Sequence, residues 1–343
     1  MYKKNFLLFL IIFLGVLVTL LNGMKVAVLP ELNKPEYIIM DEKQLIVADY
    51  GKQLHLYSMK DFKYQKQLFK KGEGPSEAPC LGFVRVTPEF IYSYCMGKNL
   101  FFNRDGRFVK GFRIPPSKIS YIIPVKDKYV IETRKRKNSI GELSMEISLS
   151  TCNLKNEMQY EKLLYYYEIP HIAWKGNRRP LLLIKHERNT FIFENRIFIC
   201  DSERGLYVQV YDLDGTRLYN VKLDSEKLKV GDNYSQESTD KLKEAGQWES
   251  FNSQFYYELP EYFPAFFRFY VGKNKFYFLT YKRIGNNREV VICDWKGKNV
   301  KKTFIPWVNY GDLRNYYIWN DKFYWLVDNE EREEWELHSA DLN

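Results

Sequence analysis

The sequence has few of the residues, and none of the motifs, on which most catalytic sites depend. Its 343 residues include four histidines and five cysteines, and no two cysteines have CxxC spacing. A zinc cluster or a dithiol redox centre is therefore not indicated. The HExxH, GxSxG and Walker A patterns are missing, as is a GxGxxG between a strand and a helix. These absences argue against metalloproteases, α/β-hydrolases, P-loop NTPases and dinucleotide-dependent enzymes.

The cysteine count is odd, which leaves at least one thiol unpaired in an exported chain. The five are Cys80, Cys95, Cys152, Cys200 and Cys293. Cys95, Cys200 and Cys293 lie in or beside predicted strands, where a small apolar cysteine is an ordinary core residue. We expect these three to belong to the core.

One pattern does recur: a short polar turn followed by a run of aliphatic and aromatic residues. The runs have the length of β-strands, and most are followed by an alternating strand, a tight turn and another strand. The six runs are Leu45–Ala48, Phe90–Tyr94, Tyr129–Ile131, Ile197–Cys200, Phe276–Leu279 and Phe323–Val327. A repeated unit that cannot bury its own faces is typical of radial β-repeat proteins. The sequence therefore predicts a β-propeller.

Turn chemistry and spacing set the size of the unit. Asp105-Gly106 and Asp214-Gly215 each divide a pair of alternating segments, as a two-residue hairpin turn does. The runs begin 45, 39, 68, 79 and 47 residues apart. Three of these values fit a four-stranded blade of roughly 40–50 residues. The two long spacings require insertions, near 165–185 and 224–262. We predict an all-β fold with six antiparallel blades of four strands each.

The two ends of the chain predict how the ring closes. The sixth unit stops where its hairpin turn would lie, so its fourth strand is missing. Lys25–Pro30 has the pattern of a strand and belongs to no blade of its own. We expect it to pair with the strand near Trp335–Ser339, which removes an exposed sheet edge. Residues 24–343 then form one propeller, whose 224–262 insertion contains a short helix near Ser238 that ends at Gly246.

Residues 1–23 have the layout of a secretory signal peptide or an N-terminal membrane anchor. Lys3 and Lys4 precede the apolar run Phe6–Leu21. This run is a little shorter than the ~20 residues that usually span a bilayer. We predict an exported protein, periplasmic or at the cell surface, that meets a membrane only through this segment. Export, and the lack of a recognised nucleic-acid motif, argue against a nucleic-acid partner.

Charge and topology point to one face of the ring. The formal net charge is +9. In each blade the connection to the next blade and the turn between the second and third strands lie on one face, here called the top face. The long loops fall on this face, and loops on a rigid scaffold commonly carry function. We predict a non-catalytic binding or scaffold propeller without a cofactor, which presents this basic face to a glycan, an anionic ligand or a partner protein. The predicted binding residues are Arg134, Arg136, Arg204, Lys282 and Arg283.

The loop Phe69–Glu77, between the first two blades, resembles the Gly-x-Gly-Pro-Gly-Glu loop of bacterial six-bladed propellers of the NHL/TolB-like group. Such proteins are common as exported proteins of Bacteroides-type bacteria. Gly72, Gly74 and Pro75 match the pattern, while Ser76 replaces the glycine that usually follows the proline. The resemblance implies the fold and an exported location, and it implies no particular activity.

The alternative hypothesis is a Ca²⁺-dependent hydrolase or lactonase of the gluconolactonase kind, which holds its ion with oxygen ligands in the central tunnel. Asp49, Asp201 and Asp328 recur at nearly the same blade position, at the top ends of inner strands, and Asn286 and Asn287 are further candidates.

We prefer the non-catalytic interpretation for two reasons. Tyr94, Thr133 and Thr280 hold about the same position in the other blades. A repeated aspartate at a strand end also caps turns. A zinc lyase on the same scaffold is disfavoured because the loops have few histidines.

Overall fold

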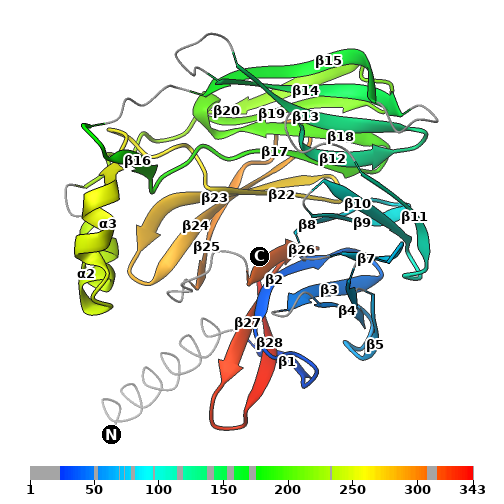
Figure 1. Ribbon diagram of the computed structural model, residues 1–343, viewed down its shortest axis with the longest axis horizontal. Helices are drawn as coiled ribbons and strands as arrows, with labels where there is room; N and C mark the ends of the chain where they lie inside the picture. The colour runs from blue at the N-terminus through cyan, green and yellow to red at the C-terminus, as the bar shows by residue number, and fades with distance from the viewer. Residues whose placement is uncertain are drawn as a thin grey trace, which may run out of the picture.

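The predicted six-bladed β-propeller is confirmed. The computed structural model describes residues 24–342 apart from 50–52, 69, 73, 79–81, 96, 114–118, 137–142, 153–157, 170–174, 232–233 and 307–314. Six antiparallel sheets of four strands each are arranged as a ring (Figure 1). In every blade the strands follow one another in space in chain order, apart from the closing strand.

The blades have the following strands. Blade 1 contains β2 (Pro35–Met40), β3 (Gln44–Asp49), β4 (Gln53–Ser58) and β5 (Tyr64–Gln67); blade 2 contains β8 (Phe83–Val86), β9 (Phe90–Cys95), β10 (Lys98–Asn103) and β11 (Phe108–Arg113). Blade 3 contains β12 (Ile119–Val125), β13 (Lys128–Arg136), β14 (Leu143–Cys152) and β15 (Met158–Ile169); blade 4 contains β17 (Arg188–Phe193), β18 (Arg196–Asp201), β19 (Leu206–Asp212) and β20 (Arg217–Leu223). Blade 5 contains β22 (Arg268–Gly272), β23 (Lys275–Ile284), β24 (Asn287–Asp294) and β25 (Lys301–Pro306); blade 6 contains β26 (Tyr316–Trp319), β27 (Lys322–Asn329), β28 (Glu334–Asp341) and β1 (Met24–Leu29).

The apolar runs of the sequence are the second strands of the blades. All six residues of β3 are buried, for example, because its two faces pack against different neighbouring blades. A strand covered on both faces needs apolar residues without alternation. The six hydrophobic clusters correspond to the six junctions between adjacent blades. The core of the protein is therefore a circle of packed blade interfaces.

The ring closes as predicted. β1 pairs antiparallel with β28, and the register joins Met24 to Ser339 and Leu29 to Trp335. Leu29 is fully buried in the cluster between blades 6 and 1. The Lys25 ammonium lies 3.0 Å from the Glu336 carboxylate. Side-chain packing and an ion pair thus support the backbone pairing.

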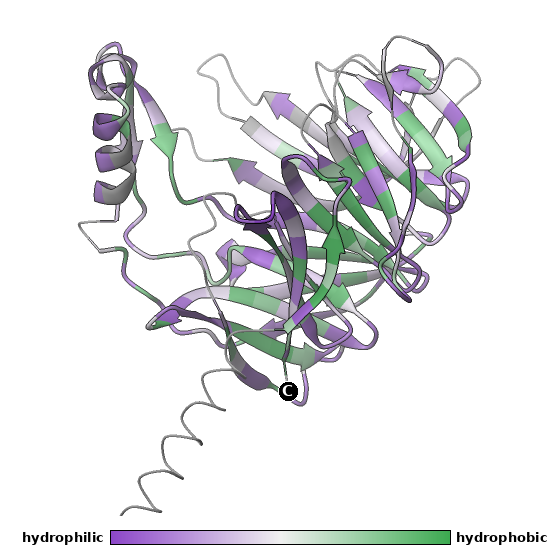
Figure 2. Cartoon of the chain, turned by 90° about the horizontal axis from the view of Figure 1, so that it is seen from below, coloured by the Kyte–Doolittle hydropathy of each residue, from purple (hydrophilic) through white to green (hydrophobic). Residues whose placement is uncertain are grey.

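The two long spacings are insertions that meet each other. β16 (Arg179–Leu182) pairs in parallel with β21 (Phe255–Glu258). Between β20 and β21 lie the helices α2 (Gln236–Glu244) and α3 (Trp248–Gln254), and Gly246 between them has φ +65°. Figure 2 shows this helix pair standing apart from the ring and largely hydrophilic. It extends the top face at one side of the ring.

The loop that resembles the NHL/TolB-like pattern is a turn held by the second blade. Lys98, which is buried, donates to the carbonyl oxygens of Gly74 (2.6 Å) and Glu77. The backbone N–H of Gly74 donates to the Glu77 side chain at 3.0 Å. Short strands β6 (Lys70–Lys71) and β7 (Glu77–Ala78) close the loop.

Two cysteines are buried free thiols, and a third forms a disulfide. Cys200 and Cys293 are core residues, as expected, and their thiols are free. Cys95 is also buried in a blade interface, but it is disulfide-bonded. The apolar segment Phe6–Leu21 lies outside the described residues. In the part of the chain that the structure describes, no helix is long and apolar enough to cross a membrane.

Candidate functional site

The five basic residues predicted to bind a ligand are distributed over three blades. Arg134 and Arg136 belong to β13 of blade 3, and their side chains lie outside the described part of the structure. Arg204 ends a short 3₁₀ helix, η1 (Ser202–Arg204), in blade 4, and Lys282 and Arg283 lie on β23 of blade 5. All five are near the turns between second and third strands, and none lines the central tunnel.

Local carboxylates offset part of this positive charge. The Lys282 ammonium lies 2.7 Å from the Glu226 carboxylate. The Arg204 guanidinium lies 3.8 Å from the Asp201 carboxylate and 5.2 Å from the ring centre of Tyr165. Arg204 is thereby drawn toward its own blade.

The three aspartates of the calcium hypothesis lie on the second strands β3, β18 and β27, one strand outside the tunnel wall. The buried Asp49 carboxylate accepts the backbone N–H groups of Asn33 (2.9 Å) and Lys34 (2.6 Å). Asp328 is exposed. Among the described residues, no group of three histidine, cysteine or acidic side chains could hold a metal ion.

Asp201 organises the top of the junction between blades 3 and 4. Its carboxylate caps η1 by accepting the backbone N–H of Glu203 at 3.0 Å. It also accepts the Tyr165 hydroxyl at 2.6 Å and the Nε–H of Arg188 at 3.2 Å. Burial and the hydrogen bond to Asp201 raise the pKa of Tyr165, so this tyrosine stays protonated. The contacts of Asp49 and Asp201 fit turn capping.

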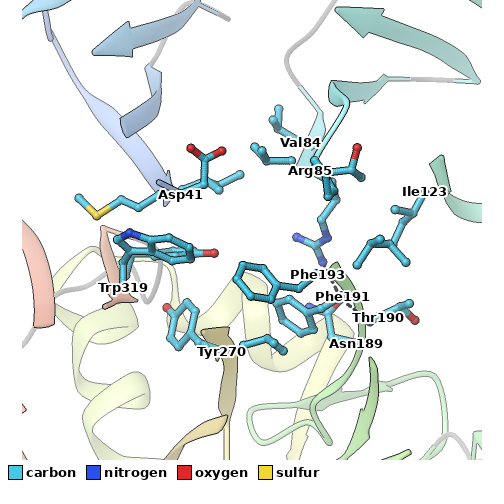
Figure 3. Close-up of a pocket in the computed structure, with 18 of the residues that line it drawn as sticks. Asp41, Val84, Arg85, Ile123, Asn189, Thr190, Phe191, Phe193, Tyr270 and Trp319 are labelled. Carbon is cyan, nitrogen blue, oxygen red and sulfur yellow. Dashed lines mark hydrogen bonds between the residues drawn. The ribbon is translucent and has the colours of Figure 1, made fainter. Parts of the chain in front are cut away.

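A cavity lies inside the ring. It has a volume of about 820 Å³, and residues from the innermost strands of all six blades line it. This volume falls within the roughly 300–1,000 Å³ of typical ligand sites. Figure 3 shows Phe191, Phe193, Trp319 and Tyr270 around it. The aromatic lining residues are Tyr37, Phe191, Phe193, Phe269, Tyr270, Tyr316, Tyr317 and Trp319.

Two of the arginines that line the cavity belong to inner strands on opposite sides of the ring. Arg85 comes from β8 of blade 2 and Arg268 from β22 of blade 5. Arg85 extends toward blade 4, where its Nη2 donates to Asn189 Oδ1 at 2.6 Å (Figure 3). Its guanidinium lies 5.9 Å from the ring centre of Phe191. An Nη1 of Arg268 lies 3.9 Å from Glu187 Oε1.

The charges of the two arginines influence each other. Burial lowers the pKa of Arg85, and the positive charge of Arg268 acts in the same direction. Burial also opposes the charge of Arg268, but the Glu187 carboxylate and nearby tyrosines outweigh it and raise the pKa of this arginine. Arginine stays protonated in either case. The upper part of the tunnel therefore holds two protonated guanidiniums, and the Glu187 carboxylate lies beside that of Arg268.

The cavity has polar groups near the top face and aromatic rings toward the underside. Asn189, Arg268 and Tyr316 lie at or near the starts of inner strands, on the side of the top face. Phe193 and Trp319 end their strands near the opposite face, the underside, and their ring centres are 6.0 Å apart.

An ion pair closes part of the underside mouth. The Arg104 guanidinium contacts the Asp41 carboxylate and donates to Gln44 Oε1 (3.1 Å) and to the Thr87 carbonyl (3.3 Å). These contacts join blades 1 and 2, so the positive charge of Arg104 is paired with a carboxylate of the fold itself.

Sequence reasoning missed Arg85 and Arg268. The one available signal was a charged residue inside a short apolar strand, as in Phe83–Val86, directly before a predicted second strand. A buried charge in such a position requires compensation. Recognising it required the inner strands to be identified first.

Comparisons with known proteins support the fold and no finer assignment. No protein-family pattern matches the sequence, and no curated protein is similar to it. The chain is similar in structure to a Bacteroides fragilis protein that is provisionally named as exported. The two sequences are 12% identical, the alignment covers 93% of this chain and 94% of that chain, and the TM-score is 0.50. It is also similar to the computationally designed Ika8 protein, with 8% identity, 92% and 99% coverage, and a TM-score of 0.41. At 12% identity the first similarity supports a common fold alone.

Proposed function

We propose that the protein is an exported, non-catalytic β-propeller that binds a small ligand in its central tunnel. One observation carries this proposal: a cavity of about 820 Å³, whose lining combines aromatic and aliphatic side chains with polar and charged ones. This is the usual composition of a small-molecule site. Aromatic rings offer large, rigid contact surfaces to a planar ligand.

The groups that line the cavity favour binding over catalysis. A nucleophile needs an adjacent base, and an acid–base pair needs groups that can exchange protons near neutral pH. Arg85 and Arg268 stay protonated, and the Asp41 carboxylate is held by Arg104. These lining residues can bind and orient a ligand.

Three observations support export. The N-terminal residues have a signal-like pattern, with Lys3 and Lys4 before an apolar run. Cys95 is disulfide-bonded, and stable disulfides are typical of oxidising compartments outside the cytoplasm. The Bacteroides fragilis neighbour has export in its provisional name. Fractionation of the native host tests this part, and full-length protein in the soluble cytoplasmic fraction would contradict it.

We further propose membership of the NHL/TolB-like group of propellers. The support is the loop that contains Gly72, Gly74 and Pro75. Lys98 of blade 2 donates a hydrogen bond to the Gly74 carbonyl of this loop. An alignment of homologues tests this proposal. Members that keep the glycines together with a lysine at the position of Lys98 would support it, and homologues that vary freely at these positions would count against it.

Binding is tested by calorimetry with a panel of neutral and charged two-ring compounds, using wild type and two variants. Phe193→Leu removes a tunnel ring while keeping an apolar side chain, and Arg283→Ala removes an exposed charge of the top face. We expect Phe193→Leu to weaken binding by about tenfold, and Arg283→Ala to have less than about a twofold effect. The opposite result would place the site on the top face instead.

A further inference from the structure

The two tunnel arginines have the arrangement of an anion-binding pair. Blades 2 and 5 stand opposite each other in a ring of six, so Arg85 and Arg268 approach the cavity from opposing walls. Both guanidiniums act at the same level, because Arg85 reaches Asn189 of β17, and Arg268 begins β22, the inner strand of the next blade. A group bound between them would meet planar N–H donors from two directions.

Each arginine is held by a side chain at the start of blade 4. Asn189 Oδ1 accepts from Arg85 at 2.6 Å and also from the backbone N–H of Thr190 at 2.9 Å, which fixes the amide in place. Glu187 lies 3.9 Å from Arg268 and does not line the cavity. Its own backbone N–H donates to the Ser202 hydroxyl at 2.7 Å. Both guanidiniums are thus oriented before any ligand arrives, which reduces the entropy lost on binding.

We infer that Arg85 and Arg268 form a clamp for an oxyanion, so that the ligand is a carboxylate, sulfate or phosphate attached to an apolar body with rings. This inference rests on the proposed tunnel site. Arginine suits such groups because its fork of N–H donors matches planar and tetrahedral oxyanions. Burial is the main cause of the lowered pKa of Arg85, and an oxyanion between the two guanidiniums would offset the smaller contribution from the charge of Arg268.

The rest of the cavity decides the shape of the ligand. Below the arginines, Phe191 and Phe193 of β17 face the cavity together with Trp319 of β26 (Figure 3). A ligand with its oxyanion at the arginines would place its body among these rings. The tunnel therefore orders a ligand with its charged end toward the top face and its apolar end toward the underside.

The test uses probes that differ in one group. They are 2-naphthoate, 2-naphthalenesulfonate and 2-naphthyl phosphate, with 2-naphthalenemethanol as the neutral partner and inorganic phosphate as an anion without a body. Calorimetry on the full mature chain should show at least one naphthyl anion binding about tenfold or more tightly than the alcohol, because charge-assisted hydrogen bonds are stronger than neutral ones. The preferred anion identifies the oxyanion type.

Variants assign the effect to the two arginines. Arg85→Met and Arg268→Met should each weaken binding of the preferred anion about tenfold or more, while binding of the alcohol changes less than about threefold. Arg85→Lys, which keeps the charge and loses the fork, should restore part of the affinity. Arg283→Ala is the matched control, since it removes a top-face arginine that does not line the cavity.

The outcomes separate this inference from the tunnel proposal. If the alcohol binds as tightly as every anion, or if each arginine variant weakens both equally, the clamp is refuted and the tunnel site stands. If inorganic phosphate binds as tightly as the naphthyl phosphate and the arginine variants abolish both, the clamp is supported but the apolar body is not part of the site. If no naphthyl compound binds wild type, both proposals fail.

Discussion

Ring closure by the first strand can be tested by truncating one leucine that this strand buries. Leu29 is the last residue of β1, its side chain is 0% exposed, and it packs with Leu32, Ile38 and Leu337 where blades 6 and 1 meet. Leucine-to-alanine changes at fully buried sites cost about 2–5 kcal/mol, because both transfer energy and cavity formation contribute. We expect Leu29→Ala to lower the free energy of unfolding by about 3 kcal/mol, which is a large part of a typical total of about 5–15 kcal/mol.

Urea unfolding followed by tryptophan fluorescence measures this loss. Val28→Ala is the matched control on the same strand, since Val28 is 36% exposed and should cost less than about 1 kcal/mol. A double variant with Leu337→Ala should show a coupling energy of at least about 0.5 kcal/mol, because the two leucines share one cluster. If Leu29→Ala costs no more than Val28→Ala, the first strand does not close the ring in solution.

Three further predictions concern a turn, a carboxylate and a thiol. Gly106→Ala should lower the free energy of unfolding, measured in urea, by about 1–3 kcal/mol, because φ is +72° there and a Cβ would collide with a buried leucine of blade 1. Gly176→Ala is the control: its φ is +63° but a Cβ there would meet open space, so it should cost only about 1 kcal/mol. Equal losses in the two variants would contradict the collision. Hydrogen bonds, the largest of them from Asn329, lower the pKa of Glu336 to about 2, so its stabilising effect is complete above the unfolded pKa of about 4.3 and is lost as pH falls toward 2. Glu336→Gln should flatten this part of the stability profile, and an unchanged acid slope would count against the depressed pKa. Burial raises the pKa of the Cys293 thiol to about 12, so it should resist a thiol reagent at pH 8 until the protein unfolds, and rapid labelling of the native chain would show that the blade interface is open.

The architecture could be predicted because its signals are local. The second strands are covered on both sides, so their sequences are uninterrupted apolar runs such as Phe276–Leu279. The predicted hairpin turns at Gly106 and Gly215 both have positive φ, +72° and +74°. The extra strand before the first blade and the missing fourth strand of the last blade were likewise identified from the sequence pattern alone. Each of these features depends only on a few adjacent residues and on whether they are buried.

The tunnel could not be predicted in this way, because its contacts join distant residues. Arg85 meets Asn189 across 104 positions of sequence. The parallel pairing of β16 with β21 likewise joins two insertions that the spacing had located but could not connect. The inner strands are short, and some of them, such as Arg268–Gly272, combine a charged residue with aromatic ones. Which face of an inner strand lines the tunnel depends on how blades from both halves of the chain curve together.

The direction of the closing strand relates the tunnel to the N-terminus. β28 runs from the top face toward the underside, and β1 is antiparallel to it, so Met24 lies near the underside and Leu29 near the top. The chain therefore enters the ring from the underside, next to the face where Phe193 and Trp319 end their strands. The arginine end of the tunnel lies at the opposite face. Were residues 1–23 retained as a membrane anchor, the membrane would adjoin the underside, where Asp41–Lys43 and Glu194–Asn195 line the cavity.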